Sequence, residues 1–248
     1  MYVIAHLSDP HLDGSPEAAG RLRRVTDYLA SLTRPVDVVL VTGDLADHGT
    51  RDEYAEVDRA LTLDLPVLVL PGNHDVGTQL RAGLGRLIGE DRPVHQVREV
   101  GAARFVLVDS SVPDEVHGEL EQPTLDWLRT ALIEPWDGPV FVCMHHPPIE
   151  VGHPVMDGWR MFSADGLAAA LDGTRVTAIL TGHVHAAIAS TFAGVPLLIA
   201  PGIRSTVPLP FEPIGGGGDL VDTAAPPGLA FHVYGDDGTL RTHFRYLP

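Results

Sequence analysis

The segment VTAILTGHVHAA, residues 176–187, joins a short apolar run to a glycine and two histidines that stand one residue apart. The run has the length and composition of a buried β-strand, and its polar residues begin where that strand should end. His183 and His185 therefore occupy positions where a turn residue would usually suffice. Similar apolar runs followed by polar residues recur along the chain, and this recurrence decides the fold class.

Five earlier runs rich in Val, Ile and Leu are also almost continuously apolar, which favours strands buried on both faces. Amphipathic stretches of helical length lie between the runs. This alternation predicts a layered α/β fold. The runs are YVIAHL at 2–7, DVVLVT at 37–42, PVLVLP at 66–71, RFVLVD at 104–109, PVFVCM at 139–144 and TAILTG at 177–182, and the helical stretches are 16–32, 50–63, 78–89, 122–133 and 164–172.

The pattern changes after His185. Short alternating segments at 187–193, 195–200, 229–235 and 240–247 are separated by Pro and Gly, which predicts antiparallel strands that complete the same domain. Residues 202–228 contain too many Pro and Gly for a helix or strand, so we predict a long loop, either a flap over the site or a dimer contact. Because no linker divides the chain, we expect one domain over residues 1–248.

Composition limits the partners. The formal net charge of −16 argues against a nucleic-acid groove and an anionic membrane surface, since both need clustered cations. The one cysteine, Cys143, lies in an apolar run, and no apolar stretch reaches the ~20 residues that span a bilayer. MYVIAHLSD lacks the basic start of a signal peptide. We therefore expect a cytoplasmic protein with a small-molecule ligand, and neither a nucleic acid polymer nor a membrane as partner.

Five of the apolar runs are followed directly by residues that can bind a metal. In a largely parallel sheet the carboxyl ends of the strands lie on one edge, so these loops should converge on one crevice. The residues are Asp9 and His11 in SDPHLD, Asp44 in GDLADHG, Asn73, His74 and Asp75 in GNHDVG, His145 and His146 in HHPP, and His183 and His185 in GHVH.

Such a cluster of carboxylates and imidazoles limits the kind of chemistry that the site can carry out. Packed closely with few cations nearby, these groups would be costly to bury unless a metal ion lay among them. Oxygen and nitrogen ligands without thiolate suit Mn, Fe, Co or Zn. The number of candidate ligands exceeds what one ion usually takes from a protein, so two ions that share one carboxylate fit better.

Each motif also has a plain structural interpretation. Gly43 and Asp44 alone would be a turn, Asp9 and His11 alone a solvated loop, and GNHD alone an Asn-rich turn with Asp75 as a helix cap. Coincidence after five separate strands is much harder to accept.

The other histidines fit ordinary surface or core positions, with two alternatives left open. His146 could lie beside the ligands or only pack, and His153, in the loop at 150–162, could contact a substrate or only pack in that loop. Asp75 could orient a neighbouring imidazole instead of capping a helix. The ordinary positions are His6, His48, His95, His117, His232 and His243.

The motifs DPH, GD, GNHD, HHP and GHVH, in this order and with intervening strands, resemble the five signature blocks of the calcineurin-like metallophosphoesterase superfamily. The match runs from Asp9 to His185, and five ordered motifs are specific where one is not. The SS pair at 110–111 and HHPP are similar to class III cyclic nucleotide phosphodiesterases and related bacterial glycerophosphodiesterases. The resemblance implies a four-layer α/β/β/α sandwich with mixed sheets.

The resemblance also implies a site for two divalent or mixed-valence metal ions, Mn, Fe, Zn or Co. Asp9, His11 and His185 would bind the first ion, Asn73, His145 and His183 the second, and Asp44 would bridge them. His183 and His185, the two histidines of GHVH, would thus bind one ion each. His74 would be the catalytic residue, in contact with the phosphoryl oxygens or the leaving alkoxide. Asn73 and His185 would also contact the substrate.

The implied reaction is hydrolysis of a small phosphodiester by a hydroxide that bridges the two ions. The best candidates are 3′,5′-cyclic nucleotides, and the alternative is a glycerophosphodiesterase or a phosphodiesterase of broad specificity. A non-catalytic scaffold on this fold is disfavoured because all seven ligand positions are intact, a nuclease because the chain is acidic, and a protein phosphatase because it is short. By analogy, we expect a homodimer or a higher homo-oligomer.

Overall fold

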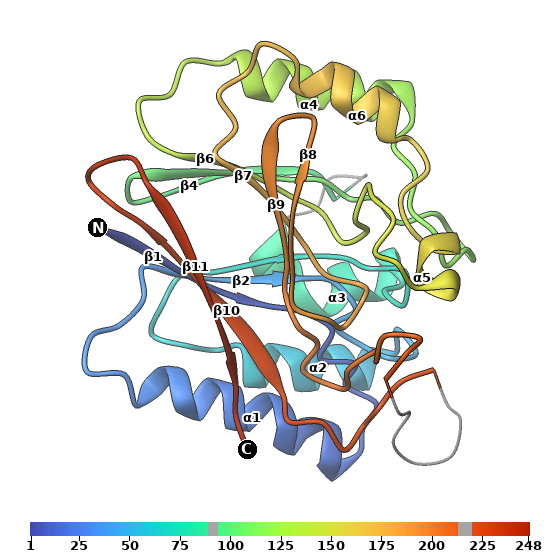
Figure 1. The fold of residues 1–248 in the computed structure, drawn as a ribbon. Coiled ribbons are helices and arrows are strands. Elements are labelled where there is room, and N and C mark those ends of the chain that lie inside the picture. The colour runs from blue at the N-terminus through green and yellow to red at the C-terminus, as the bar shows by residue number, and fades with distance from the viewer. Residues whose placement is uncertain (89–93, 213–219) are drawn as a thin grey trace.

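The structure, a computed structural model, describes residues 1–88, 94–212 and 220–248 and contains two mixed β-sheets between two layers of helices (Figure 1). The strand order is β11-β10-β1-β2-β3 in the first sheet and β4-β5-β6-β7-β9-β8 in the second. The strands are β1 (Tyr2–Leu7), β2 (Val38–Thr42), β3 (Val67–Leu70), β4 (Gln96–Val100), β5 (Ala103–Leu107), β6 (Val140–Cys143), β7 (Ala178–Thr181), β8 (Ile188–Phe192), β9 (Val195–Ile199), β10 (Gly228–Tyr234) and β11 (Leu240–Tyr246).

Each sheet has a parallel part that ends in antiparallel strands. In the first sheet β1, β2 and β3 run parallel, while β10 is antiparallel to both β1 and β11. In the second sheet β5, β6, β7 and β9 run parallel, and β4 and β8 are antiparallel edges. The parallel strands therefore place their carboxyl ends together within each sheet.

Helices cover the outer face of each sheet. Helices α1 (Pro16–Ala30), α2 (Arg51–Ala60) and α3 (Gly77–Ile88) pack on the first sheet, and α4 (Gln122–Ile133) and α6 (Ala164–Leu171) pack on the second (Figure 1). A third apolar layer joins the inner faces of the two sheets, with Ile4, Leu40, Phe105 and Phe141 fully buried in it. This arrangement confirms the predicted α/β/β/α sandwich with mixed sheets.

Local sequence explains where two helices begin. The Ser15 side chain accepts a hydrogen bond from the backbone of Ala18, directly before Pro16 at the first turn of α1. Thr50 and Glu53 form a reciprocal capping box at the start of α2. These caps follow β1 and β2 closely, so they fix where the intervening loops must turn.

All six predicted apolar runs form strands, but two elements were not predicted. Strand β4 has alternating burial and lies at a sheet edge, so it lacks the continuous apolarity that marks the central strands. Helix α5 (Pro154–Gly158) has only five residues, too few for a periodic pattern.

The prediction for the chain after His185 was right about strands and partly wrong about their pairing. Strands β8 and β9 form an antiparallel hairpin, yet β9 also pairs in parallel with β7 and so belongs to the second sheet. Strands β10 and β11 instead extend the first sheet beside β1. Pairing with a distant strand leaves no local signal in the sequence.

Most of the loop predicted at 202–228 is described, apart from residues 213–219. In its described part the extended structure is a bridge between Thr206 and Asp222 and the final residue, Gly228, which begins β10. The side chain of Phe211 is 83% exposed, and the dimer contact expected around it stays a prediction. Within the described residues, no helix has the length and apolarity needed to cross a bilayer.

Two histidines lie in the apolar layer between the sheets. His6 on β1 and His232 on β10 are fully buried, with the Nδ1 of His6 3.0 Å from the Nε2 of His232. Burial holds the pKa of His232 at about 3, and burial together with His232 holds the pKa of His6 well below its ordinary value. Both imidazoles are therefore neutral in the folded protein at neutral pH.

This burial predicts a loss of stability in mild acid. Unfolded histidine has a pKa of about 6.5, so below that pH the unfolded chain binds protons that the folded chain excludes. The free energy of unfolding should be full above about pH 6.5 and fall below it, by about 1.4 kcal/mol per histidine at about pH 5.5. Urea unfolding of the metal-free protein at several pH values measures this.

The His232→Gln variant is the control, because Gln keeps a donor and an acceptor but does not titrate. Its free energy of unfolding should fall less steeply between about pH 7 and pH 5.5 than that of the wild type. Equal slopes for the two proteins would contradict the assignment.

Candidate metal centre

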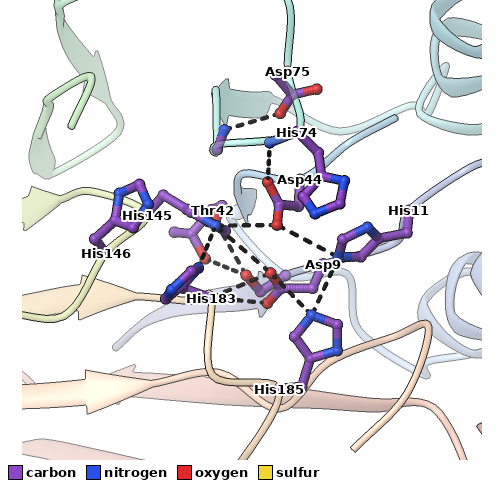
Figure 2. Close-up of polar contacts among 12 residues, drawn as sticks. Asp9, His11, Thr42, Asp44, His74, Asp75, His145, His146, His183 and His185 are labelled. Carbon is purple, nitrogen blue, oxygen red and sulfur yellow. Dashed lines mark hydrogen bonds and ion pairs between the residues drawn. The ribbon is translucent and has the colours of Figure 1, made fainter. Parts of the chain in front are cut away.

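The polar residues that follow five parallel strands lie together at one edge of the molecule (Figure 2). The predicted crevice exists, but its residues come from two sheets and not from one. Strand β1 leads to Asp9 and His11, β2 to Asp44, β3 to Asn73 and His74, β6 to His145, and β7 to His183 and His185.

Five of these residues have a backbone conformation that non-glycine residues rarely adopt. Their φ angles are 53° for Asp9, 41° for His11, 49° for Asp44, 71° for His183 and 49° for His185. In the described part of the chain only Asp114 and Ala193 share this property. Each such residue costs about 1–3 kcal/mol, so the strain is concentrated at the site.

One group of ligand atoms is formed by Asp9, His11 and His185, all buried. The Nε2 atoms of His11 and His185 are 3.1 Å apart, and that of His185 is 3.6 Å from Oδ1 of Asp9. The backbone amide of His183 donates to the Asp9 carboxylate at 3.1 Å, and this hydrogen bond helps to hold the carboxylate in position.

Asp44 connects this group to a second one. Its Oδ2 lies 3.4 Å from Nε2 of His11 and 3.2 Å from Nε2 of His145 (Figure 2). The Nδ1 of His183 lies 3.2 Å from the same nitrogen of His145. The Asp44 carboxylate is therefore placed between the two groups of imidazoles.

Asn73 lines the same pocket as Asp44 and His183 and has an unsatisfied atom. Its Oδ1 is buried and has no hydrogen-bond donor among the described residues. A buried amide oxygen without a partner is rare in native proteins and costly. Oxygen is also a ligand that divalent cations accept, so the donor set fits a bound cation.

Three of the histidines are oriented by a hydrogen bond at the ring nitrogen that faces away from the site. The Nδ1 atoms of His11, His145 and His185 contact Asp47 Oδ1 at 2.9 Å, the Thr42 carbonyl at 2.7 Å and Ser205 Oγ at 2.8 Å, respectively. Such bonds fix the tautomer that presents Nε2 to a metal.

None of these three partners was predicted from the sequence, and the Thr42 carbonyl is a backbone group that no side-chain pattern marks. Asp47 could have been found, because it follows Asp44 by three residues in the same loop. Ser205 is separated from His185 by an entire hairpin, and nothing near it marks the contact.

The buried carboxylates of the centre favour positive charge nearby. Burial alone would lower the pKa of His145, but the Asp44 and Asp9 carboxylates outweigh it and raise this pKa to about 9. Burial lowers the pKa of His185 to about 4. A proton on His145 thus balances part of the buried negative charge, and a bound cation would displace that proton.

Residues 2–187 match the family model described as calcineurin-like phosphoesterase. The chain belongs to this family. A relative from Rhodococcus erythropolis, named a probable cyclic nucleotide phosphodiesterase, is 36% identical over 230 residues, which are 87% of this chain and 75% of the relative. A glycerophosphodiester phosphodiesterase of Enterobacter lignolyticus is 30% identical over 196 residues, 74% of this chain and 70% of the relative.

The fold agrees with solved structures. A purple acid phosphatase from yellow lupin seeds superposes with a TM-score of 0.68 at 14% sequence identity, covering 99% of this chain and 51% of that one. At this identity the likeness shows a shared fold and nothing finer.

A pocket of about 350 Å³ opens over the centre of this phosphoesterase. One side is polar and the other apolar. The polar side includes His11, Asp44, Asn73, His74, His183 and His185, and the apolar side is Val116, Met156, Trp159, Val207, Leu220 and Val221.

The pocket explains why His183 and His185 stand one residue apart. Val184, between the two histidines, is buried in an apolar cluster with Met156 and Val207, next to Trp159 and Leu220. His183 and His185 face the metal centre instead. One-residue spacing therefore anchors the loop on its apolar side and presents two imidazoles on the other.

His74 lies at the edge of the centre and is more exposed than the other residues, with 39% of its side chain accessible. Its Nδ1 lies 2.8 Å from the carbonyl oxygen of Asp47, and its backbone amide donates to Asp44 Oδ1 at 3.0 Å. Because a carbonyl can only accept, Nδ1 carries a proton, and Nε2 is available toward the pocket.

Asp75 has neither role suggested by the sequence. Its carboxylate accepts hydrogen bonds from the backbone amides of Leu45, Ala46 and Gly72 and from the Tyr54 hydroxyl. It therefore ties the loop after β2 to the loop after β3. A Cβ at Gly72 would overlap the Asp44 carboxylate, so the two loops are in very close contact and this position requires glycine.

The structure also shows the surroundings of the two histidines whose roles were left open. His146 is buried, its Nδ1 lies 2.9 Å from Ser110 Oγ, and its ring is 4.6 Å from that of His183, so it packs beside the candidate ligands. His153 caps α5, where its Nδ1 accepts from the backbone amides of Val155 and Met156. Its role is therefore within the loop.

The Asp47 contact gives a testable expectation. Asp47→Ala removes the partner of His11 Nδ1, and loss of such a partner typically costs about 10–100-fold in metal affinity. We expect Mn²⁺ affinity, measured by competition with a chelator, to fall by about tenfold or more. Asp27→Ala, which removes an exposed carboxylate on α1, is the matched control and should leave affinity unchanged. Equal affinities for both variants would show that Asp47 does not orient His11.

Proposed function

We propose that this chain is a dinuclear metal-dependent phosphodiesterase that hydrolyses small phosphodiesters, with 3′,5′-cyclic nucleotides as its preferred substrates. The observation that carries the proposal is the placement of the buried Asp44 carboxylate between two groups of imidazoles, in a pocket that Asn73, with its unsatisfied Oδ1, also lines. Oxygen and nitrogen ligands of this kind suit Mn, Fe, Zn or Co.

In this proposal the seven residues divide into two ligand sets that share Asp44. The distances support the division, because Asp44 lies within 3.4 Å of one histidine from each set. The first set is Asp9, His11 and His185, and the second is Asn73, His145 and His183.

Bound divalent ions would supply positive charge for the phosphodiester and lower the pKa of a water molecule toward neutrality. The chain's own residues hold the reacting groups. Asp9 and Asp44 bring two negative charges, which leaves the loaded site attractive to a phosphodiester monoanion. Asn73 and His185 line the same pocket and would contact the substrate.

His74 is proposed as the catalytic residue. Its Nδ1–H donates to the Asp47 carbonyl, so Nε2 is the nitrogen that can take up a second proton, and the resulting imidazolium can donate that proton to a phosphoryl oxygen or to the departing alkoxide. Its ring lies 4.6 Å from that of His11, at the mouth of the pocket. It is therefore close to the centre without being needed as a ligand.

The apolar side of the pocket favours a nucleotide. Met156, Trp159, Val207, Leu220 and Val221 form a wall next to the polar centre. A planar base can stack on an indole and on aliphatic side chains, whereas a glycerol group has no comparable apolar surface. Glycerophosphodiesters stay the alternative, since one relative bears that name.

Two further parts of the proposal concern the cellular location and the oligomeric state. Cys143 is fully buried and unpaired, which suits the reducing cytoplasm that we propose as the location. A homo-oligomer is proposed by analogy alone.

The first test is metal content together with hydrolysis of bis(p-nitrophenyl) phosphate and p-nitrophenyl phosphate, with and without Mn²⁺. We expect about two ions per chain and a clear preference for the diester. Asn73→Ala should lose about one ion and most of the activity while its circular dichroism spectrum stays that of the wild type. Protein that binds no metal and turns over neither substrate would favour a non-catalytic scaffold.

The second test concerns the apolar wall. Trp159→Ala should lower kcat/KM for 3′,5′-cyclic AMP by about tenfold or more, because base stacking contributes roughly 1–3 kcal/mol. Hydrolysis of glycerophosphoethanolamine should change by less than about twofold, and Trp159→Phe should retain most activity toward the nucleotide. A parallel loss with both substrates would mean that Trp159 maintains the loop and does not recognise the base.

A further inference from the structure

A line of polar side chains crosses the otherwise apolar inner face of the first sheet. It takes one residue from each of four neighbouring strands, namely Thr242 of β11, His232 of β10, His6 of β1 and Thr42 of β2. Thr242 and His232 are direct partners in the strand register, and the other two continue the line toward the metal centre. Leucine and valine occupy most of the surrounding layer, so a polar line here is unexpected.

Adjacent members of the line are all within hydrogen-bond distance. His232 Nδ1 is 2.9 Å from Thr242 Oγ1, His6 Nδ1 is 3.0 Å from His232 Nε2, and His6 Nε2 is 2.9 Å from Thr42 Oγ1. His6, His232 and Thr42 are fully buried. The line is therefore closed to solvent over most of its length.

The line ends at the backbone carbonyl of Thr42. The Thr42 hydroxyl lies 2.9 Å from Ser8 Oγ, and the Ser8 hydroxyl lies 3.1 Å from the Thr42 carbonyl oxygen. That oxygen also accepts from Nδ1 of His145 at 2.7 Å (Figure 2). Gly182 allows this approach, because a Cβ there would overlap Ser8 Oγ.

The Thr42 hydroxyl also lies 3.4 Å from the Leu7 carbonyl oxygen, the longest of its contacts. One direction of donation satisfies all the shorter contacts. The Thr42 carbonyl can only accept, so Ser8 donates to it and must accept from the Thr42 hydroxyl. Thr42 then accepts from His6 Nε2, His6 Nδ1 accepts from His232 Nε2, and His232 Nδ1 accepts from Thr242. Both imidazoles are neutral in this arrangement, in keeping with the low pKa that burial gives each of them.

We propose that His6 and His232 are positioning residues for His145: their hydrogen-bond chain fixes Thr42, whose carbonyl selects the His145 tautomer that offers Nε2 to a metal. The inference rests on the proposed function, in which His145 is a ligand. It extends the ligand environment across the first sheet to its edge strand β11.

A purely structural role makes a different prediction. Two apolar residues of similar size can replace a buried polar pair with little change in stability, because neither is then left unsatisfied. A positioning role requires that such a replacement weaken metal binding even when stability is kept. Measurements of stability and metal affinity on the same variants separate the two roles.

The test measures Mn²⁺ binding by chelator competition and urea unfolding for wild type, His6→Leu/His232→Leu, His6→Gln and Ile4→Ala. Ile4 lies on β1 in the same apolar layer and is paired with His232 in the strand register, but its side chain takes no part in the hydrogen bonds of the line, so Ile4→Ala controls for lost packing beside it. We expect the weaker-bound ion of the double variant to lose affinity by about tenfold, the order found for partners of metal ligands. Ile4→Ala should be destabilised with unchanged affinity.

His6→Gln is the conservative variant, because its amide can donate to Thr42 and accept from His232. It should bind Mn²⁺ within about threefold of wild type. Nitrogen-15 NMR of the histidine rings gives an independent readout. We expect neutral Nε2–H tautomers for His6 and His232 and the Nδ1–H tautomer for His145 in the metal-loaded wild type.

The outcomes are distinct. Wild-type affinity in the double variant, or an Nδ1–H tautomer at His6, would overturn the positioning role and leave the proposed function intact. A wild-type protein that binds no Mn²⁺ would overturn the proposed function and this inference with it.

Discussion

The carboxylates of Asp9 and Asp44 are buried at the edge where two sheets meet, and in the described structure their ion-pair partners are all histidines. Negative charge buried without a permanent cation is expensive, because neither water nor an arginine offsets it. The folded protein is therefore stabilised by any positive charge that binds beside these carboxylates. Much of the surrounding structure holds these carboxylates and the nearby imidazoles in position for a cation to bind.

The local backbone reflects this constraint. Five candidate ligands have left-handed backbone angles, a strain that only dense surroundings can maintain. Those surroundings include the amides that Asp75 holds together and the bonds from Asp47, Ser205 and Thr42 to the outer nitrogens of three imidazoles. An imidazole fixed in this way loses little freedom when it binds a metal, so part of the cost of binding is already met by folding.

The opposite side of the pocket shows how one loop can serve two environments. Val184 is buried in the apolar cluster that includes Met156, while His183 and His185 on either side of it face the centre. The same cluster gives the pocket its apolar wall through Trp159 and Val207. In the proposed function, this single short segment would couple recognition of an organic group to retention of the metals.

The sequence by itself determined most of the strands, though not the edge strand β4, together with the layered α/β class and seven candidate ligands, because each depends on local order: an apolar run followed at once by polar residues. Family resemblance added the four layers and the division of ligands into two sets, and the structure bears out the layers. Only the tertiary structure decided which sheet each strand joins, since β9 pairs with β7 and β10 with β1 across long stretches of chain. It also decided that Ser205 contacts His185, that His232 contacts His6 and that His6 contacts Thr42. These contacts join residues far apart in sequence, and the residues next to them in the chain are those of ordinary hydrophobic strands and turns.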